Sequence, residues 1–408
     1  MKALLCILIV AGSLPLTAAV SFDREVTPIF RKSCNGCHRP GKEKGGLDLT
    51  SHAGVLKGGK HGNILGAGQA KDTRLIEAIT GPEPDMPKEG EPLTTDQVAL
   101  LAKWIQEGAK DDTPAEVVWT EPPVYKAAPI ITAVAYSAGD EWLAVAGVHE
   151  VILLGGTNFG VVRHLVSPAP RIESFEFSPD GKLLAVAAGA PGVLGEIQIW
   201  DPRAGTMLHR YKVAFDSVYG VHWSPDGTRL AFGCADKTAR ILQVTDGREI
   251  VKFDQRSDWV FGAAFVQGGK QIVTASRDRS LKLVDATTGA LLDIVTRDKE
   301  PIVCMAKHPG EDWIVFGSEV RPRLYKAVAK PDNINPDKDP NAIREFENFE
   351  NGVTAASLRP DGKYHASAGS PPGEGRRHQV TAAQRKATRK GQEGTRESVG
   401  SGGGGDGG

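Results

Sequence analysis

A short turn motif recurs through the second half of the chain. Pro-Asp-Gly occurs at residues 179–181, 225–227 and 360–362, and each copy follows an alternating, strand-like run. Proline presets one turn angle and glycine tolerates a left-handed one, so Pro-Asp-Gly between apolar runs predicts a β-turn. Weaker copies lie at residues 137–140, 266–269 and 308–310. A spacing of roughly 40 to 50 residues predicts a series of similar antiparallel β-sheets.

Other features of this region fit a known repeat. The run Ile197–Asp201 ends in a Trp-Asp dipeptide, and Leu281–Asp285 is a weaker copy followed by a Thr-Gly hairpin. Asp236 and Asp278 stand where WD-repeat blades carry a turn aspartate. The region resembles WD repeats, which implies a β-propeller over residues 131–369 with an incomplete or truncated last blade. The Gly-His dipeptide of that family is missing, which argues against its hydrogen-bonded tetrad.

Two segments do not fit the repeat. Residues 331–340 are expected to form an inserted, solvent-exposed loop in the fifth blade. Residues 370–408 are low-complexity, rich in Arg, Lys, Gln and Gly, and are predicted to be a disordered tail. Because the last blade stops where its second strand should continue, truncation or a shifted reading frame is the alternative explanation.

Near the N-terminus, Cys34-Asn35-Gly36-Cys37-His38 has the C-x-x-C-H pattern of a covalent haem c site. The two thiols add across the vinyl groups of haem, and the adjacent imidazole is placed to bind the iron. A structural zinc site would need a second Cys/His pair, and a thioredoxin-like redox pair would need a strand–helix–strand setting. The flanking sequence favours neither, so one covalent haem c is expected on Cys34, Cys37 and His38.

A haem without an open site needs a second axial ligand. Met86 lies between two prolines, in Pro84-Asp85-Met86-Pro87, and is the only methionine within residues 22–112. A thioether stabilises ferrous iron and raises the reduction potential. The chemical alternative is His52 or His61, which would give a bis-His haem of lower potential. We expect His38 and Met86 to be the iron ligands.

The sequence around these residues resembles the planctomycete-type cytochrome c domain. The shared pieces are residues 26–30, 34–38, 45–49, 57–59, 86–87 and 93–109. In that family C-x-x-C-H holds haem and a Met-Pro methionine is the distal ligand, so the resemblance carries these roles to Cys34, Cys37, His38 and Met86. It implies a small all-α haem domain over residues 22–112. Lys88, where a second proline commonly follows, departs from the pattern.

Three helices are expected in this domain. Pro28 suits the first turn of the first helix, with Thr27 as its cap, and Asp72 is expected to cap the second. Thr94-Thr95-Asp96-Gln97 has a capping-box pattern at the start of the third. Trp104 on this helix is expected to pack against the haem edge rather than to conduct electrons. The glycine- and lysine-rich residues 57–62 lack a complete phosphate-binding pattern and are expected to wrap closely around haem.

Length and composition set the remaining limits. A chain of 408 residues is too long for one ordinary domain, and a net charge of −1 gives no global field for nucleic acid or an anionic membrane. Residues 1–19 are typical of a secretory signal peptide, which predicts export to the bacterial periplasm and no transmembrane segment after cleavage. Prolines mark residues 113–130 as a linker. Cys234 and Cys304 are expected to be buried free thiols, with a disulfide as the alternative.

These features favour an exported electron-transfer cytochrome whose propeller docks redox partners and other exported proteins. Neither a catalytic triad nor a redox motif stands out in the blades. The first alternative is a haem oxidoreductase that resembles cytochrome nitrite reductases, with a second haem in the propeller. It would need suitably placed histidines among His149, His164, His209, His222, His308 and His365. The other is a redox- or gas-sensing scaffold in which Met86 is easily displaced.

Overall fold

The structure is a computed structural model that describes residues 19–40, 42–66, 73–113, 119–127, 129–331, 339–349, 352–358, 364–369 and 379–384. The chain divides into two compact units, residues 1–117 and 118–408, and each is described by itself. The predicted signal peptide lies outside the described residues apart from its last residue. None of the helices in the described ranges is long and apolar enough to cross a bilayer.

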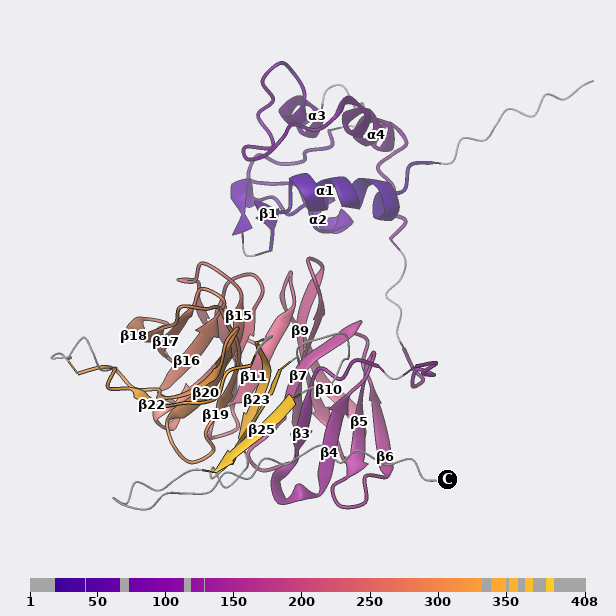
Figure 1. Ribbon diagram of the computed structural model, residues 1–408. Helices are drawn as coiled ribbons and strands as arrows, with labels where there is room; N and C mark the ends of the chain where they lie inside the picture. The colour runs from indigo at the N-terminus through magenta and orange to yellow at the C-terminus, as the bar shows by residue number, and fades with distance from the viewer. Residues whose placement is uncertain are drawn as a thin grey trace, which may run out of the picture. The chain divides into compact units, whose positions relative to one another are not determined.

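The first unit is helical and begins with two consecutive helical segments. A π-helix, η1 (Phe22–Val26), runs directly into α1 (Thr27–Ser33), and Pro28 occupies the first turn of α1 as predicted. The predicted cap Thr27 is wrong, because the helical stretch starts earlier and Ser21 Oγ accepts the backbone N–H of Arg24 at 3.0 Å. This stretch delivers the chain to the C-x-x-C-H segment (Figure 1).

Three further α-helices complete this unit. They are α2 (His52–Lys57), α3 (Arg74–Ile79) and α4 (Thr95–Gln106). The capping box at the start of α4 is confirmed, with Thr94 and Gln97 each accepting a backbone N–H of the other. Thr73 caps α3 through a bond from the N–H of Ile76, and the expected cap Asp72 lies outside the described residues. Short elements near the site are β1 (His38–Arg39), β2 (Lys42–Glu43) and the 3-10 turn η2 (Lys44–Gly46).

The core of the helical unit forms between η1, α1 and α4. Val26, Phe30, Leu101 and Trp104 are fully buried in it. Trp104 stacks on Phe22 with ring centroids 5.3 Å apart, and its Nε1 donates to the Lys110 carbonyl at 3.0 Å. Trp104 therefore packs inside this core, and its predicted contact with the haem edge stays a prediction.

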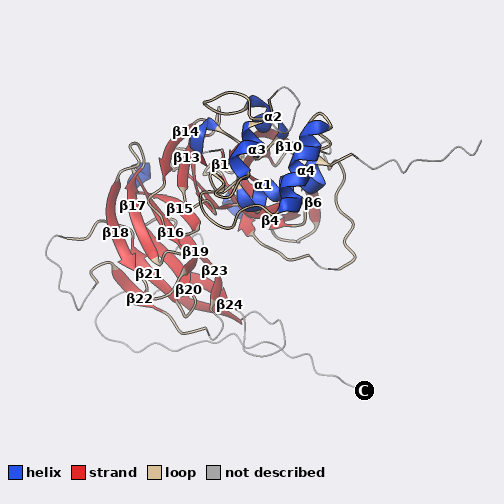
Figure 2. Cartoon of the chain, turned by 90° about the horizontal axis from the view of Figure 1, so that it is seen from above, coloured by secondary structure: helices blue, strands red, loops and turns tan. Residues whose placement is uncertain are grey.

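The described residues of the second unit form six antiparallel β-sheets, five with four strands and one with three, and Figures 1 and 2 show their arrangement. The first sheet has β3 (Val134–Tyr136), β4 (Trp142–Ala146), β5 (Glu150–Gly155) and β6 (Val161–Val166). The second has β7 (Arg171–Phe177), β8 (Leu184–Ala190), β9 (Leu194–Asp201) and β10 (Thr206–Ala214). The third has β11 (Val218–Trp223), β12 (Arg229–Cys234), β13 (Ala239–Gln243) and β14 (Glu249–Phe253). The fourth has β15 (Val260–Val266), β16 (Gln271–Ser276), β17 (Ser280–Asp285) and β18 (Leu291–Arg297).

The last two sheets follow the same plan. The fifth has β19 (Ile302–Lys307), β20 (Trp313–Ser318), β21 (Pro322–Lys326) and β22 (Ala342–Glu345), and the sixth has β23 (Val353–Leu358), β24 (Tyr364–Gly369) and β25 (Gln379–Gln384). β25 pairs with β24 and lies inside the segment predicted to be a disordered tail, which stays a prediction. β24 offers these six residues an edge for backbone hydrogen bonds, which composition does not reveal. The predicted insertion lies between β21 and β22, and its residues 332–338 are outside the described residues.

The first two Pro-Asp-Gly motifs form the turns between the first and second strands of their sheets. Ser178 Oγ donates to Asp180 Oδ1 at 2.7 Å and accepts the N–H of Leu183 at 2.9 Å. Ser224 and Asp226 repeat the first of these bonds in the third sheet. The third copy, at residues 359–362, lies outside the described residues. Each turn closes on its own side chains, which explains why the motif is legible in the sequence.

Apolar side chains fill the spaces between neighbouring sheets. Leu153 of the first sheet clusters with Phe175 of the second, and Phe253 of the third clusters with Phe265 of the fourth. The first strands of successive sheets also pack beside one another, from β3 to β23. The described residues of β23 and β3 make no comparable contact, so the propeller is not closed. The predicted fold class, a small all-α domain followed by a WD-repeat-like β-propeller, is confirmed.

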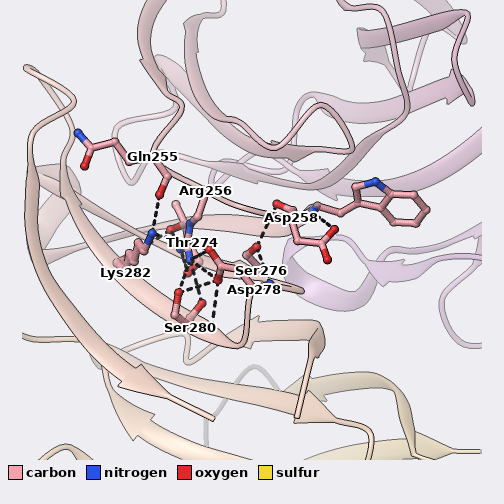
Figure 3. A network of polar contacts seen from close by, with 9 residues as sticks. Gln255, Arg256, Asp258, Thr274, Ser276, Asp278, Ser280 and Lys282 are labelled. Carbon is pink, nitrogen blue, oxygen red and sulfur yellow. Dashed lines mark hydrogen bonds and ion pairs between the residues drawn. The ribbon is translucent and has the colours of Figure 1, made fainter. Parts of the chain in front are cut away.

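A buried polar network lies in the fourth sheet around the predicted turn aspartate Asp278 (Figure 3). Arg256, whose side chain is 0% exposed, donates to Asp278 Oδ1 at 3.0 Å and to Ser280 Oγ at 2.7 Å. Its other terminal nitrogen donates to the Thr274 carbonyl at 2.7 Å. Asp278 also accepts the N–H and the hydroxyl of Ser280. The predicted turn aspartate is confirmed, and an arginine joins it to the neighbouring strands.

Candidate functional site

The C-x-x-C-H segment forms a tight turn directly after α1. The N–H of Cys34 donates to the Phe30 carbonyl at 2.8 Å, and the N–H groups of Cys37 and His38 both donate to the Cys34 carbonyl, at 3.0 and 3.1 Å. Both cysteines are free thiols and half-buried, and burial raises the pKa of Cys34 to about 11. One turn of five residues therefore holds two free thiols and an imidazole.

The tautomer of His38 is set by the next loop. Its Nδ1 lies 2.9 Å from the carbonyl oxygen of Lys44, and the N–H of Lys44 donates to the Cys37 carbonyl at 3.0 Å. A carbonyl only accepts, so Nδ1 carries the proton and Nε2 keeps its lone pair. This is the arrangement of a metal-binding histidine, whose second ring nitrogen is held by an outer partner. The half-exposed His38 is thus oriented to use Nε2 as a ligand.

Met86 lies against the same core as the C-x-x-C-H turn. It is half-buried and packs, together with Cys34 and Leu47, on the apolar cluster of the helical unit. Its N–H donates to the Ala78 carbonyl at 2.8 Å, which fastens the Met86 loop to the end of α3. The structure thus brings the predicted thioether and one predicted thiol to one core.

The two alternative ligands have different surroundings. His52 Nε2 lies 2.7 Å from the Ala109 carbonyl, its Nδ1 lies 3.7 Å from Asp111 Oδ2, and its ring packs edge-on against Phe22. Both nitrogens of His52 thus have protein partners, which opposes a role as iron ligand. His61 lies exposed in the glycine-rich loop.

The glycines of this loop are required by a contact between two loops. The N–H of Lys60 donates to the Gly45 carbonyl at 2.7 Å. A Cβ at Gly59 would lie 2.7 Å from the Gly45 oxygen, and one at Gly58, where φ is +70°, would lie 2.3 Å from the Gly62 oxygen. Only glycine permits such an approach. The expected wrapping around haem stays a prediction.

Two buried polar atoms beside this turn have no partner in the described structure. They are Oδ1 of Asn35, a residue that is 5% exposed, and Nε of Arg39. Buried polar atoms are usually satisfied, so these two indicate a missing polar group. A haem would supply carboxylates for the Arg39 guanidinium, and the two thiols, the imidazole and the thioether are donors that c-type haem uses. The residues present therefore fit this cofactor.

A metal site other than the haem iron would need a cluster of ligating side chains. In the ranges that the structure describes, His, Cys, Asp and Glu side chains form no group of three or more suited to a metal ion. Three propeller histidines have partners within the propeller: His149 Nδ1 lies 2.9 Å from the Ala169 carbonyl, His164 Nδ1 lies 2.6 Å from Glu150, and His209 stacks on Tyr211.

The other propeller histidines and the two propeller cysteines have separate surroundings. His222 Nδ1 lies 3.4 Å from Glu176, and His308 Nδ1 accepts two backbone N–H groups. The side chain of His365 is outside the described part. Cys234 and Cys304 are free thiols rather than a disulfide, and burial raises the pKa of Cys304 to about 12.

Sequence reasoning missed the residues that support the site. The Lys44 carbonyl that orients His38 is a backbone atom and has no signature in the sequence. Arg39 directly follows the motif, but only its unpartnered buried nitrogen distinguishes it from an ordinary surface arginine. For Arg256, a basic residue ahead of a turn aspartate carries no pattern that would have predicted the network.

Family comparisons agree with this two-part structure. Residues 34–90 match the planctomycete cytochrome C model, which spans both the C-x-x-C-H turn and Met86. Residues 247–285 match the WD domain, G-beta repeat, and residues 215–264 match the WD40 domain of anaphase-promoting complex subunit 4. The chain thus matches a cytochrome c family model in its first unit and WD-repeat models in its second. The predicted resemblance is confirmed on both counts.

Similarity to individual curated proteins is confined to part of the chain. A periodic tryptophan protein 2 homolog of Caenorhabditis elegans is 24% identical over 156 residues, which are 38% of this chain and 17% of that protein. A WD repeat-containing protein of Synechocystis is 30% identical over 148 residues, 36% of this chain and 41% of that protein. Protein groucho of Drosophila melanogaster is 24% identical over 123 residues, which are 30% of this chain and 16% of that protein. The chain thus spans less than half the length of each of these relatives.

Proposed function

We propose that this chain is an exported c-type cytochrome that carries one covalent haem c, transfers single electrons, and docks proteins through its propeller. The observation that carries the proposal is the His38 ring, fixed by the Lys44 carbonyl beside two free thiols with its Nε2 left for a metal. Bound haem would supply an iron that gains and loses one electron.

Each site residue has a separate task in this proposal. The thiols of Cys34 and Cys37 would hold the haem covalently, each by addition of its S–H across one vinyl group. His38 Nε2 and the Met86 sulfur would be the ligands of its iron. Two protein ligands leave no open position for a substrate, which favours electron transfer over catalysis.

The docking role rests on the second unit. WD repeats are supported by two family matches, and the outer strands carry exposed apolar side chains such as Val161, Leu208 and Leu292, at 60%, 48% and 44% exposure. Such side chains are available for contact with another protein. Residues 1–19 support export, and periplasmic recovery of the mature protein after cell fractionation would test it.

An optical spectrum of the mature protein tests the haem site. We expect a weak far-red sulfur-to-iron band in the ferric form, which Met86→Ala abolishes and Met207→Ala retains, because Met207 lies on β10. Haem quantification should give one per chain, and two would favour the oxidoreductase alternative. A colourless protein with two titratable thiols at Cys34 and Cys37, from a host competent for haem attachment, would refute the proposal.

A further inference from the structure

Charge is distributed unevenly along the helical unit. Residues 31–61, which contain the C-x-x-C-H turn, carry seven basic and two acidic side chains, a net charge of +5. Residues 73–113, which contain Met86 and α4, carry four basic and nine acidic side chains, a net charge of −5. The near-neutral total of the whole chain conceals this separation.

Backbone hydrogen bonds place the basic residues around His38. Lys44 bonds through its carbonyl to the His38 ring and through its N–H to Cys37. Lys60 bonds to Gly45, the neighbour of Lys44, and the position of a Gly46 Cβ lies 3.0 Å from Lys60 Cγ. Both lysines are exposed. Two loops therefore hold two lysines beside the candidate iron ligand.

The basic charges in this half are not neutralised by acids of the same unit. Arg31, Lys32, Lys44, Lys57 and Lys60 are all exposed, and none forms an ion pair with a described residue. We name these five residues the basic face.

The acidic side chains have different partners in the two halves of the helical unit. Asp48, within the basic half, accepts the N–H and the hydroxyl of Thr50 at 2.9 and 2.7 Å. In the acidic half, by contrast, Lys88 pairs with Asp85 at 3.4 Å and Lys103 pairs with Glu107 at 3.7 Å. Glu43 stands opposite His38 in the β1–β2 pair, but seven basic side chains outnumber the two acidic ones, so the basic half keeps a net positive charge.

The Met86 loop has the opposite sign. Glu83, Asp85, Glu89 and Glu91 are exposed around Met86, with Lys88 as the one basic residue between them. An anionic partner is attracted to the His38 side of the site and repelled from the Met86 side.

We propose that the basic face is the docking surface for an acidic electron-transfer protein. The inference rests on the proposed function and adds to it the side of approach and the charge of the partner. One electron passes between the haem, bound at Cys34, Cys37 and His38, and the redox centre of that partner. Complementary charge raises the rate of encounter, and salt at physiological strength, with a Debye length of about 8 Å, reduces this effect.

Two double variants with equal changes in charge test the docking surface in the full-length holoprotein. Lys44→Glu with Lys60→Glu reverses the charge of the two exposed lysines that backbone hydrogen bonds hold beside His38. Lys103→Glu with Lys110→Glu changes net charge equally on and after α4, which Figures 1 and 2 both place on the other side of the helical unit from β1. The probe is hexacyanoferrate(III), an anion that takes one electron from the ferrous protein. Its rate is measured by stopped flow between about 10 and 200 mM ionic strength.

We expect the Lys44/Lys60 variant to react about tenfold more slowly at low salt, with a weaker salt dependence. The Lys103/Lys110 variant should lose clearly less. Equal losses in the two variants would mean that only net charge matters and would overturn the proposal.

Retention on a carboxylate ion-exchange resin needs no haem, so it separates this proposal from the proposed function. The Lys44/Lys60 variant should elute at lower salt than its matched control even from colourless protein. If Lys44 and Lys60 instead governed co-sedimentation with phosphatidylglycerol vesicles but not the hexacyanoferrate rate, the face would bind membranes and the proposal would be wrong.

Discussion

Replacing Asp278 by asparagine should destabilise the propeller far more than the loss of one surface charge would. The Asp278 side chain is 6% exposed and the Arg256 side chain 0% exposed, and Lys282 Nζ lies 3.7 Å from the same carboxylate. Removing the negative charge leaves two cations without their counter-charge, one of them fully buried. Breaking a buried pair in this way costs about 3–5 kcal/mol of unfolding free energy.

Urea unfolding of the full chain, followed by far-UV circular dichroism, measures this cost. In thermal unfolding, each kcal/mol of lost stability lowers Tm by roughly 2–4 °C, so the expected loss in Tm is on the order of 10 °C. Arg256→Met together with Asp278→Asn should be less destabilised than Asp278→Asn alone, because the buried cation is then gone. As a control, Asp246→Asn should have no measurable effect, because the Asp246–Arg248 pair, 3.9 Å apart, is largely exposed. Unchanged stability in Asp278→Asn would refute the reasoning.

The same pair gives a dependence of stability on pH. Burial raises the pKa of Asp278, but attraction to Arg256 and the hydrogen bond from Ser280 outweigh burial, and the net pKa is lowered. A pKa lower in the folded than in the unfolded chain stabilises the fold above the unfolded value of about 3.9, and this contribution is lost as the pH falls further. The difference between wild type and Asp278→Asn should therefore shrink below about pH 4.

Three further predictions concern the helical unit and the linker. Thr94→Ala should destabilise the haem unit by about 1 kcal/mol, because α4 loses its cap. Urea unfolding followed by haem absorbance measures this loss. Asp96→Ala, which removes no capping bond, is the control, and an equal effect in both variants would contradict the assignment. His52→Ala should leave the far-red band unchanged, and its loss would show that His52 affects ligation. Tyr125→Phe should make residues 119–127 more sensitive to limited proteolysis, because the bond of 2.6 Å to buried Glu150 is lost, whereas Tyr136→Phe should not.

Features that depend on neighbours in sequence were predictable. The turn of Ser178, Pro179, Asp180 and Gly181 closes on its own side chains, and the Thr94 box closes over three residues. Cys34, Cys37 and His38 meet because one turn of backbone carries all three. In each case the chemistry lies within a few covalent steps, so residue identity and spacing are enough.

Features that depend on distant partners required the folded chain. The His52 ring nitrogens contact the Ala109 carbonyl, 57 residues away in sequence, and the nearby Asp111 carboxylate. The Lys44 carbonyl sets the tautomer of His38. The strand β25 depends on an edge offered by β24, and Arg256 finds Asp278 only after two strands have paired. Backbone carbonyls are the same in every residue, so only the path of the chain decides which side chain meets them. The sequence alone thus determined the haem-binding pattern and the blade repeat, and the tertiary structure decided which ring nitrogens and buried charges have partners.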